Sequence, residues 1–233
     1  YSGSTADNWG STATPGENGT LYSSGVTDLG FGGEFPATNG AFQEVYGGIY
    51  DVGILKYDST GTQLLYASYL GGSNSESPHS LVVDDQKNLL VLGTTSSTNF
   101  PTTAGAIDRS FNGGTFVNHV VDYSNGSDLF VSKINQDGDV LIGSTYLGGS
   151  QNDGLNPHVT GQLVANYGDQ LRGDIIADAT GDIYISTVTA SSNFPVVNSF
   201  GMTYNQGITD ALLVKLNSTL TTIKWAAFLG GTK

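Results

Sequence analysis

The sequence has no cysteine and few basic residues, since 8 Lys and Arg stand against 21 Asp and Glu. Without cysteine the chain can form no disulfide, thiolate metal site or cysteine nucleophile. The net charge of −13 would repel nucleic acid and anionic membranes, so we expect neither as a partner. No apolar run reaches the roughly 18 residues that a membrane-spanning helix needs, and no signal peptide is recognisable. We therefore expect a mature or excised piece of a longer protein.

Charged side chains are also scarce, at 12% of residues, whereas glycine occurs 33 times. The exposed faces of helices usually carry Glu, Lys and Arg, so this composition favours short strands joined by many turns. Hydrophobic residues make up 38%, many of them β-branched or aromatic, which is typical of an ordered chain. The 233 residues are enough for one all-β domain with a sizeable core or for two smaller domains.

One five-residue motif occurs three times: an aromatic residue, leucine, two glycines and a hydroxyl residue. Its copies are Tyr69–Ser73, Tyr146–Ser150 and Phe228–Thr232, at nearly regular spacing. Such a repeat indicates one supersecondary unit copied along the chain. We interpret the glycine pair as the end of each unit and expect positive φ angles there, so that Gly72→Val or Gly149→Val would damage folding.

Two strands are predicted before each glycine pair. The nearer strand spans residues 62–69, 139–146 or 222–228. The farther strand begins with Asp and ends with Lys, in the copies Asp51–Lys56, Asp128–Lys133 and Asp210–Lys215. Short polar turns at residues 58–61 and 135–138 join the two strands into a hairpin.

Another hairpin precedes those two strands in each unit. Its strands are predicted at residues 80–84 and 89–93, at 174–178 and 183–186, and, in a weaker copy, at 11–14 and 20–23. The continuous apolar runs in it predict strands that are buried on both faces. A Phe-Pro pair follows, beginning at Phe35, Phe100 or Phe194, and marks the end of a strand because Pro cannot donate to a ladder.

Each unit thus has four sequential antiparallel strands, the pattern of a β-propeller blade. We predict an all-β fold in which residues 1–233 form a single propeller segment with blades at 9–72, 79–149 and 172–231. Propellers usually close with about four to eight blades, so we expect three blades of a larger propeller. A three-bladed disc and closure by another chain are the alternatives. The long links at 94–127 and 159–171 are expected to carry binding loops.

The Asp-to-Lys strands, the Leu-Gly-Gly copies and the Phe-Pro pairs together resemble the SBBP-type β-propeller repeat of long secreted and cell-surface bacterial proteins. Residues Ser4–Gly10 and Ser77–Ser80 look like the variant in very large surface proteins of Bacteroidota. The resemblance implies export by the type IX secretion system, an association with gliding motility, and an extracellular or outer-membrane-associated location. It brings no catalytic residues to this sequence.

Three histidines are candidate metal ligands: His79, His119 and His158. His79 and His158 lie in Pro-His pairs that follow a glycine pair, which would place them at equivalent points on adjacent blades, facing the central channel. Zinc needs three or four converging ligands. A histidine that satisfies backbone groups where a strand begins is the simpler interpretation. We therefore predict no catalytic, cofactor-binding or metal-binding residue, with calcium as the alternative cofactor.

Acidic turns are the places where calcium could bind, namely Asn135–Asp139, Asp84-Asp85 and Asp178–Asp182. The first of them has Tyr146 where the twelfth position of an EF-hand loop requires an acid. Turn geometry explains these residues better, because Asp, Asn and Gly favour the backbone angles of turns.

The recurring Asp51, Asp128 and Asp210 each begin a strand and are expected to accept hydrogen bonds from backbone N–H groups. Lining a central channel is the alternative. The lysine that follows five residues later lies on the opposite face of the strand, so we expect no ion pair within the strand.

Aromatic residues fall into two groups. Tyr69, Tyr146 and Phe228 occupy matched positions and are expected to pack between blades. Tyr123, Tyr167 and Tyr204 lie in the links, where exposed aromatics, as in 118–127 and 166–170, would suit stacking on sugars or a protein partner.

No Gly-x-Ser-x-Gly, His-Glu-x-x-His or phosphate-binding motif is present, and no acid stands apart from the repeat. We predict a non-catalytic structural and binding module, for adhesion or protein interaction, in a large secreted or cell-surface bacterial protein. Its partner would be a protein or glycan at the cell surface, such as outer-membrane secretion or motility machinery. The alternative is a carbohydrate-binding or carbohydrate-active domain, whose hydrolytic form needs two carboxyls about 5–10 Å apart. Calcium-dependent adhesion is a third hypothesis.

Overall fold

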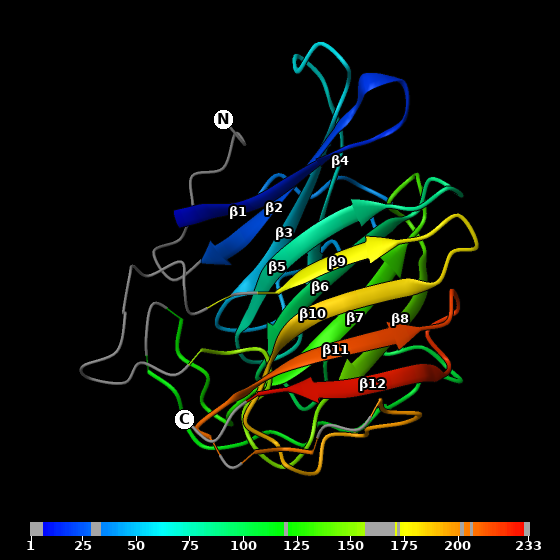
Figure 1. The fold of residues 1–233 in the computed structure, drawn as a ribbon. Coiled ribbons are helices and arrows are strands. Elements are labelled where there is room, and N and C mark those ends of the chain that lie inside the picture. Colours follow the sequence, from blue (N-terminus) through cyan, green and yellow to red (C-terminus); the bar gives the residue numbers. More distant parts are fainter. Residues whose placement is uncertain are drawn as a thin grey trace.

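The computed structural model describes residues 7–28, 34–118, 121–156, 171, 173–200, 203–205 and 207–230. These residues form three four-stranded antiparallel sheets, each with its strands in sequence order (Figure 1). Blade 1 consists of β1 (Asp7–Pro15), β2 (Leu21–Asp28), β3 (Asp51–Tyr57) and β4 (Leu64–Leu70), with the 3-10 turn η1 (Glu17–Gly19) after β1. Blade 2 consists of β5 (Glu76–Val83), β6 (Leu89–Thr95), β7 (Asp128–Ile134) and β8 (Leu141–Leu147). Blade 3 consists of β9 (Asp174–Ala177), β10 (Ile183–Thr189), β11 (Asp210–Leu216) and β12 (Ile223–Leu229).

The sheets confirm the prediction of an all-β fold built from four-stranded propeller repeats. Each strand predicted from the sequence overlaps an observed strand. The first strands of the blades contact one another in turn, β1 with β5 and β5 with β9, as inner strands of neighbouring propeller blades do. Blade 1 lies at the top of Figure 1 and β12 at the bottom. In the part of the chain that the structure describes, the three sheets do not close into a ring.

Two strands begin earlier than the sequence predicts. β5 begins at Glu76, not at Ser80, and β1 begins at Asp7, not at Ser11. In β5 the register shifts between Pro78 and Ser80, so the residue that cannot donate to a ladder sits at a bulge inside the strand. The prediction that Pro78 precedes the strand was therefore wrong.

The core lies between the blades. One hydrophobic cluster joins blade 1 to blade 2 and includes Tyr22, Ile54 and Phe130. A larger cluster joins blade 2 to blade 3 and includes Leu92 and Leu212. Blade 2 thus has a neighbour on each side, and every residue of β6 and β7 is buried. The prediction that the first two strands of each unit are buried on both faces is confirmed for blade 2 and wrong for blades 1 and 3, where burial alternates along β2 and β10.

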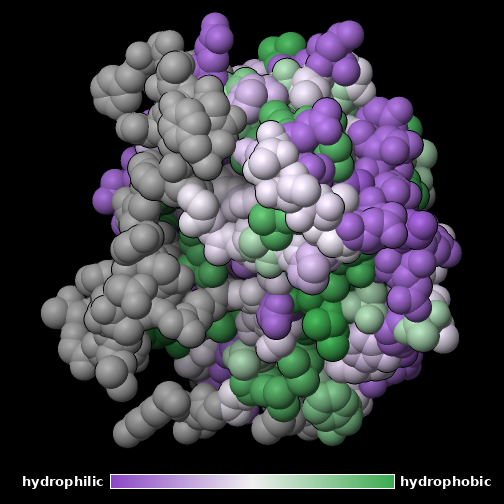
Figure 2. Space-filling model, turned by 90° about the horizontal axis from the view of Figure 1, so that it is seen from above, coloured by the Kyte–Doolittle hydropathy of each residue, from purple (hydrophilic) through white to green (hydrophobic). Residues whose placement is uncertain are grey.

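Hydrophobic residues also reach the surface, in patches among hydrophilic ones (Figure 2). The large exposed residues include Ile176 and Phe200 of blade 3, with 57% and 60% of their surface exposed. In the described residues no helix is long and apolar enough to cross a membrane.

Candidate functional site

Two buried carboxyl groups meet at the junction of blades 1 and 2, on either side of the Gly71-Gly72 turn. Asp51 begins β3 and accepts a hydrogen bond from the Gly47 N–H at 2.7 Å. Glu76 begins β5 and accepts one from the Gly72 N–H at 2.9 Å. A Cβ on Gly71 would lie 2.6 Å from both Asp51 Cγ and Glu76 Oε2. The glycine is therefore required because it leaves room for two carboxyls.

The junction of blades 2 and 3 repeats this arrangement. The Asn112 N–H donates to Asp128 at 2.7 Å, and the Gly149 N–H donates to Asp153 at 2.8 Å. A Cβ on Gly148 would lie 2.6 Å from Asp128 Cγ and 3.0 Å from Asp153 Oδ2. In both junctions, the acid that begins the third strand of one blade and an acid that follows the glycine pair thus lie on either side of the turn.

The glycine pairs differ from the sequence prediction in one respect. None of Gly71, Gly72, Gly148 and Gly149 is among the residues with positive φ. A Cβ on Gly72 would instead lie 2.5 Å from Ser97 Cβ and 2.8 Å from Asn99 Oδ1. The prediction of positive φ was wrong, and close packing is the reason for glycine.

The carboxyls of these junctions hold protons more tightly than free carboxyls do. Burial raises the pKa of Asp51 to about 7 and that of Asp128 to about 7, and the charge of Asp153 adds to the rise at Asp128. Burial also raises the pKa of Glu76 to about 7, with repulsion from Asp51, and that of Asp153 to about 6. Neutral forms are favoured because water no longer solvates the charge.

Blade 3 contains the first half of the same arrangement. Asp210 begins β11 and accepts a hydrogen bond from the Asn205 N–H at 2.7 Å. Its Oδ1 is buried and has no hydrogen-bond partner among the described residues. Gly230 passes beside it, and a Cβ there would lie 2.5 Å from Asp210 Cγ.

The prediction that Asp51, Asp128 and Asp210 accept backbone hydrogen bonds is thus confirmed. They do not line an open channel, because no more than 2% of any of the three is exposed.

The lysine of each Asp-to-Lys strand pairs with an acid of the turn between the first two strands of its own blade. The pairs are Lys56–Glu17 at 2.8 Å, Lys133–Asp84 at 2.7 Å and Lys215–Asp182 at 2.9 Å. These partners were missed in the sequence, since the acid occupies a different turn position in each copy. The available signal was that every one of the three turns contains an acid.

The acidic turns have the hydrogen bonds of ordinary turns. Asn135 Oδ1 accepts from the Asp139 and Val140 N–H groups at 3.1 and 3.0 Å. Asp84 Oδ1 accepts from the Asn88 N–H at 2.9 Å, and Asp178 Oδ1 from the Asp182 N–H at 3.0 Å. Within the described ranges, no three His, Asp or Glu side chains gather as metal ligands.

Of the three histidines, only His79 lies in the described residues. It belongs to β5, and its Nε2 is 2.7 Å from Thr94 Oγ1. It thus bonds to a side-chain hydroxyl and not to the backbone. Burial lowers its pKa to about 3, so the ring is neutral at physiological pH. His119 and the pair Pro157-His158 lie outside the described residues.

The matched aromatics are buried, with at most 4% of Tyr69, Tyr146 and Phe228 exposed. Packing between blades is confirmed for Tyr146 and Phe228, whose hydrophobic clusters join neighbouring blades, whereas Tyr69 packs within blade 1 and its link, on Phe35 and Tyr46. The link aromatics differ from the prediction. Tyr123 is fully buried, and Tyr204 is half-buried against Phe228, with ring centroids 5.6 Å apart. The links fold back over the strand ends, which covers these rings. Tyr167 lies outside the described residues.

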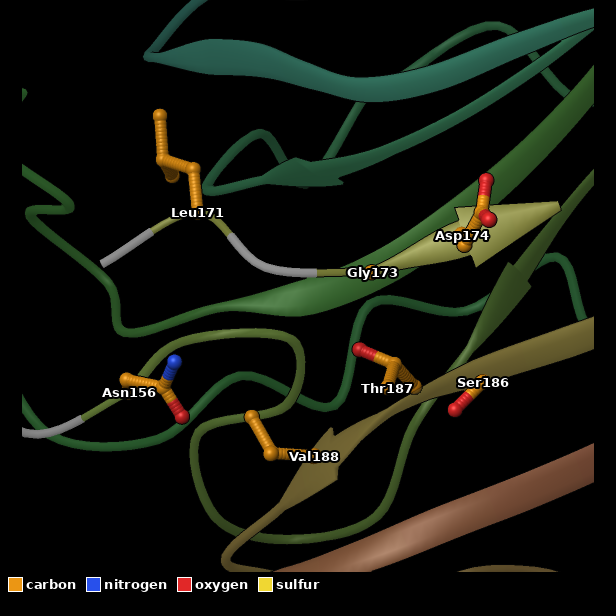
Figure 3. Close-up of a pocket in the computed structure, with 7 residues that line it drawn as sticks. All are labelled: Asn156, Leu171, Gly173, Asp174, Ser186, Thr187 and Val188. Atoms are coloured by element: carbon orange, nitrogen blue, oxygen red, sulfur yellow. The ribbon is translucent and has the colours of Figure 1, made fainter. Parts of the chain in front are cut away.

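A shallow surface pocket of about 530 Å³, which we call the cavity, lies beside the start of β9 and the end of β10 and is open to solvent (Figure 3). It is lined by Asn156, Leu171, Gly173, Asp174, Ser186, Thr187 and Val188. Asp174 is held in place by the Ser80 hydroxyl, which donates to its Oδ1 at 2.6 Å. Amide, hydroxyl and carboxyl groups beside apolar side chains suit a polar ligand such as a sugar.

This cavity was not predicted as a set of residues. Asn156 and Leu171 flank the inserted link that the sequence marked as a binding loop, and residues 159–170 of that link lie outside the described residues. The other lining residues come from β9 and β10 or lie just before β9, which the sequence marked only as strands.

A search of curated proteins gave no match to the chain. A family model described as "SBBP: Beta-propeller repeat" matches residues 65–101. The matched stretch runs from β4 to the loop after β6 and contains Gly71, Gly72, Glu76, Ser97 and Asn99 of the first junction, whereas Asp51 lies before it. At the junction of blades 1 and 2, the chain is thus similar to the SBBP β-propeller repeat.

Proposed function

We propose that the chain is a non-catalytic structural and binding module of a large secreted or cell-surface bacterial protein. The observation that carries this proposal is the use of the buried acids. Asp51, Glu76, Asp128 and Asp153 have strongly raised pKa values, as catalytic acids often do. Each is fully buried and accepts backbone hydrogen bonds at a blade junction, so these acids serve the assembly of blades.

The partner we propose is a protein or a glycan at the cell surface, bound by the links and the cavity beside β9. The resemblance to SBBP repeats of Bacteroidota supports export by type IX secretion and contact with secretion or motility machinery. The acidic surface, with a net charge of −13, is consistent with an extracellular module that repels nucleic acid. No cofactor is part of the proposal.

Carbohydrate binding is the second candidate function, and the cavity favours it. Its lining offers Asn156, Asp174, Ser186 and Thr187 to hydroxyl groups and Val188 to an apolar sugar face. A carbohydrate-active enzyme would additionally need a second convergent acid. Asp174 is the one carboxyl among the residues that line this cavity.

A glycan array with a parallel hydrolase screen tests both functions. Glycan binding that Asp174→Asn abolishes, and that the exposed control Asp85→Asn leaves unchanged, would establish the second candidate. Turnover of any glycan that a single Asp→Asn change removes would overturn the non-catalytic proposal. For calcium-dependent adhesion, a melting temperature that a chelator leaves unchanged would exclude the metal.

A further inference from the structure

Each blade turns one sheet face toward the blade that follows it, and we call this the leading face. Across that face runs a row of four residues paired through all four strands. In blade 1 the row is Thr14, Tyr22, Lys56 and Tyr66. In blade 3 it is Ile176, Tyr184, Lys215 and Trp225.

The two rows have the same aromatic geometry. The rings of Tyr22 and Tyr66 are 6.2 Å apart at 67°, and Lys56 Nζ lies 4.9 Å from the Tyr22 centroid. In blade 3 the rings of Tyr184 and Trp225 are 6.4 Å apart at 67°, and Lys215 Nζ lies 4.6 Å from the Tyr184 centroid. The leading face of blade 3 is therefore built like that of blade 1.

Blade 2 covers the row of blade 1 with the turn between β7 and β8. Lys56 Nζ donates to the Gln136 carbonyl at 2.9 Å, and the Phe42 N–H donates to the Gly138 carbonyl at 2.8 Å. A Cβ on Gly138 would lie 2.6 Å from atoms of the Tyr66 ring. The large ring of one blade thus requires glycine in the turn of the next.

At the junction of blades 2 and 3 the small residue lies in the row and the large residue lies in the turn. Gly143 takes the row position of Tyr66, and Leu220 takes the turn position of Gly138. A Cβ on Gly143 would lie 3.3 Å from Leu220 Cδ1. The polar contacts are kept, since Lys133 Nζ donates to the Ser218 carbonyl at 3.4 Å and the Ile107 N–H to the Leu220 carbonyl at 3.1 Å. Size complementarity at this one position therefore determines which turn fits which face.

The corresponding residues of blade 3 are exposed or only half-buried. Ile176 is 57% exposed and Phe200 60%, and Phe200 packs on the half-buried Trp225 with centroids 5.9 Å apart. Phe200 follows Asn198, whose φ is 48°, as Phe42 follows Gly40, whose φ is 85°. Beside this face lies Asp210, whose Oδ1 has no hydrogen-bond partner among the described residues, like the Oδ1 of Asp51 beside the covered face of blade 1.

We propose that the leading face of blade 3 docks a further blade of the same four-stranded repeat. Two features define this partner. Its third and fourth strands are joined by an Asp/Asn-x-x-Gly turn, because Trp225 leaves room only for glycine. An acid near its start lies beside Asp210 across Gly230, as Glu76 lies beside Asp51 across Gly71 and Asp153 beside Asp128 across Gly148.

A fusion tests the proposal. Residues 74–149 are appended after Thr232, so that a second copy of blade 2, with its Gly138 turn and Glu76, follows blade 3. Trp9→Phe leaves Trp225 as the sole tryptophan. We expect a blue shift of Trp225 emission, a loss of acrylamide quenching, and slower hydrogen exchange in β11 and β12. An unchanged Trp225 environment overturns the proposal, even if the added blade is unfolded, because the face should order a blade that fits it.

Three comparisons refine this result. In the first variant, Gly→Leu at the copied position of Gly138, the emission shift and the protection from quenching should be abolished. In the second variant, Glu→Gln at the copied position of Glu76, docking should be weaker but still present. Equal docking by the Gly and Leu fusions overturns the size rule. The unfused chain should remain monomeric in sedimentation; concentration-dependent dimers that Trp225→Asp dissolves would instead assign the face to a second copy.

Discussion

Blades 2 and 3 have the same four strands, but their surroundings differ. Blade 2 has a neighbour on both faces, and all of β6 and β7 is buried. Blade 3 has a neighbour on one face, so burial alternates along β10 and β11. Leu147 is 1% exposed, whereas the matched Leu229 is 37% exposed. The difference shows that this repeat derives its burial from the next blade, as expected where each unit packs only on its neighbours.

A large effect is expected from the lysine of the third strand. Lys133→Met removes the partner of Asp84, whose side chain is 2% exposed, and should lower the free energy of unfolding by about 3 kcal/mol. Lys215→Met, at the same position of blade 3, should cost less because the side chain of Lys215 is 19% exposed, against 6% for Lys133, so that solvent screens its ion pair more. Urea denaturation measures both. Equal losses would contradict the contrast between the blades.

The matched leucines compare the two faces with the same side chain. Leu147→Ala should destabilise by about 2–5 kcal/mol, because it leaves a cavity between blades 2 and 3. Leu229→Ala should change stability by less than about 1 kcal/mol. A loss at Leu229 as large as that at Leu147 would mean that something already covers the leading face of blade 3.

The glycine pair should be intolerant of side chains. Gly149→Val should cost about 1–3 kcal/mol or more, because its Cβ would lie 2.5 Å from Ser191 Cβ and 2.7 Å from Asn193 Oδ1. Gly10→Ala is the control, since nothing lies within 4 Å of a Cβ at Gly10. Thermal melts compare them. A Gly149→Val protein as stable as the control would contradict the packing account.

The last prediction is a pH dependence from the junction acids. The raised pKa values of Asp51, Glu76, Asp128 and Asp153 mean that the folded state binds more protons than the unfolded state between about pH 4 and 7. Stability contributed by these groups is therefore present below this window and is lost as the pH rises through it. His79 acts in the opposite direction, because its lowered pKa favours the neutral ring while the unfolded chain takes up a proton below about pH 6.5.

Melting temperatures from pH 5 to pH 8 measure this dependence. We expect a decline with pH that becomes shallower in the double variant Asp128→Asn/Asp153→Asn. Asp85→Asn, in an exposed turn, should keep the slope of the parent chain. An unchanged slope in the double variant would show that Asp128 and Asp153 do not titrate in this pH range.

Much of the fold can be predicted from the sequence because short local motifs mark the strands and turns of each repeat. The Asp-to-Lys strands, the polar turns and the Phe-Pro pairs each predict the backbone conformation of their own residues. The observed strands begin and end within a few residues of these predictions. The first residues of β1 and β5 were harder to predict from the sequence. In β5 the reason is a bulge that accommodates Pro78 inside the strand. Positive φ at Gly72 could not be distinguished from close packing, because both require glycine.

The junction acids could have been found from the sequence but were not. Glu76 and Asp153 follow their glycine pairs at the same spacing, in Gly-Gly-Ser-Asn-Ser-Glu and Gly-Gly-Ser-Gln-Asn-Asp. Their pairing with Asp51 and Asp128 depends on how two blades meet, which no local pattern reports. Tyr204 was assigned to an exposed link for a related reason: links of unequal length hide its match to Tyr46 and Phe111, which pack on Tyr69 and Tyr146.

Hydrogen–deuterium exchange of the unfused chain tests the central claim most directly, that a blade is stabilised by the blade that follows it. β7 and β11 are matched third strands, each hydrogen-bonded on both sides within its sheet. The account predicts that the amides of β7 exchange much more slowly than those of β11, because blade 3 covers β7 and, in the part of the chain that the structure describes, no blade covers the leading face of β11. Equal protection of the two strands would contradict it.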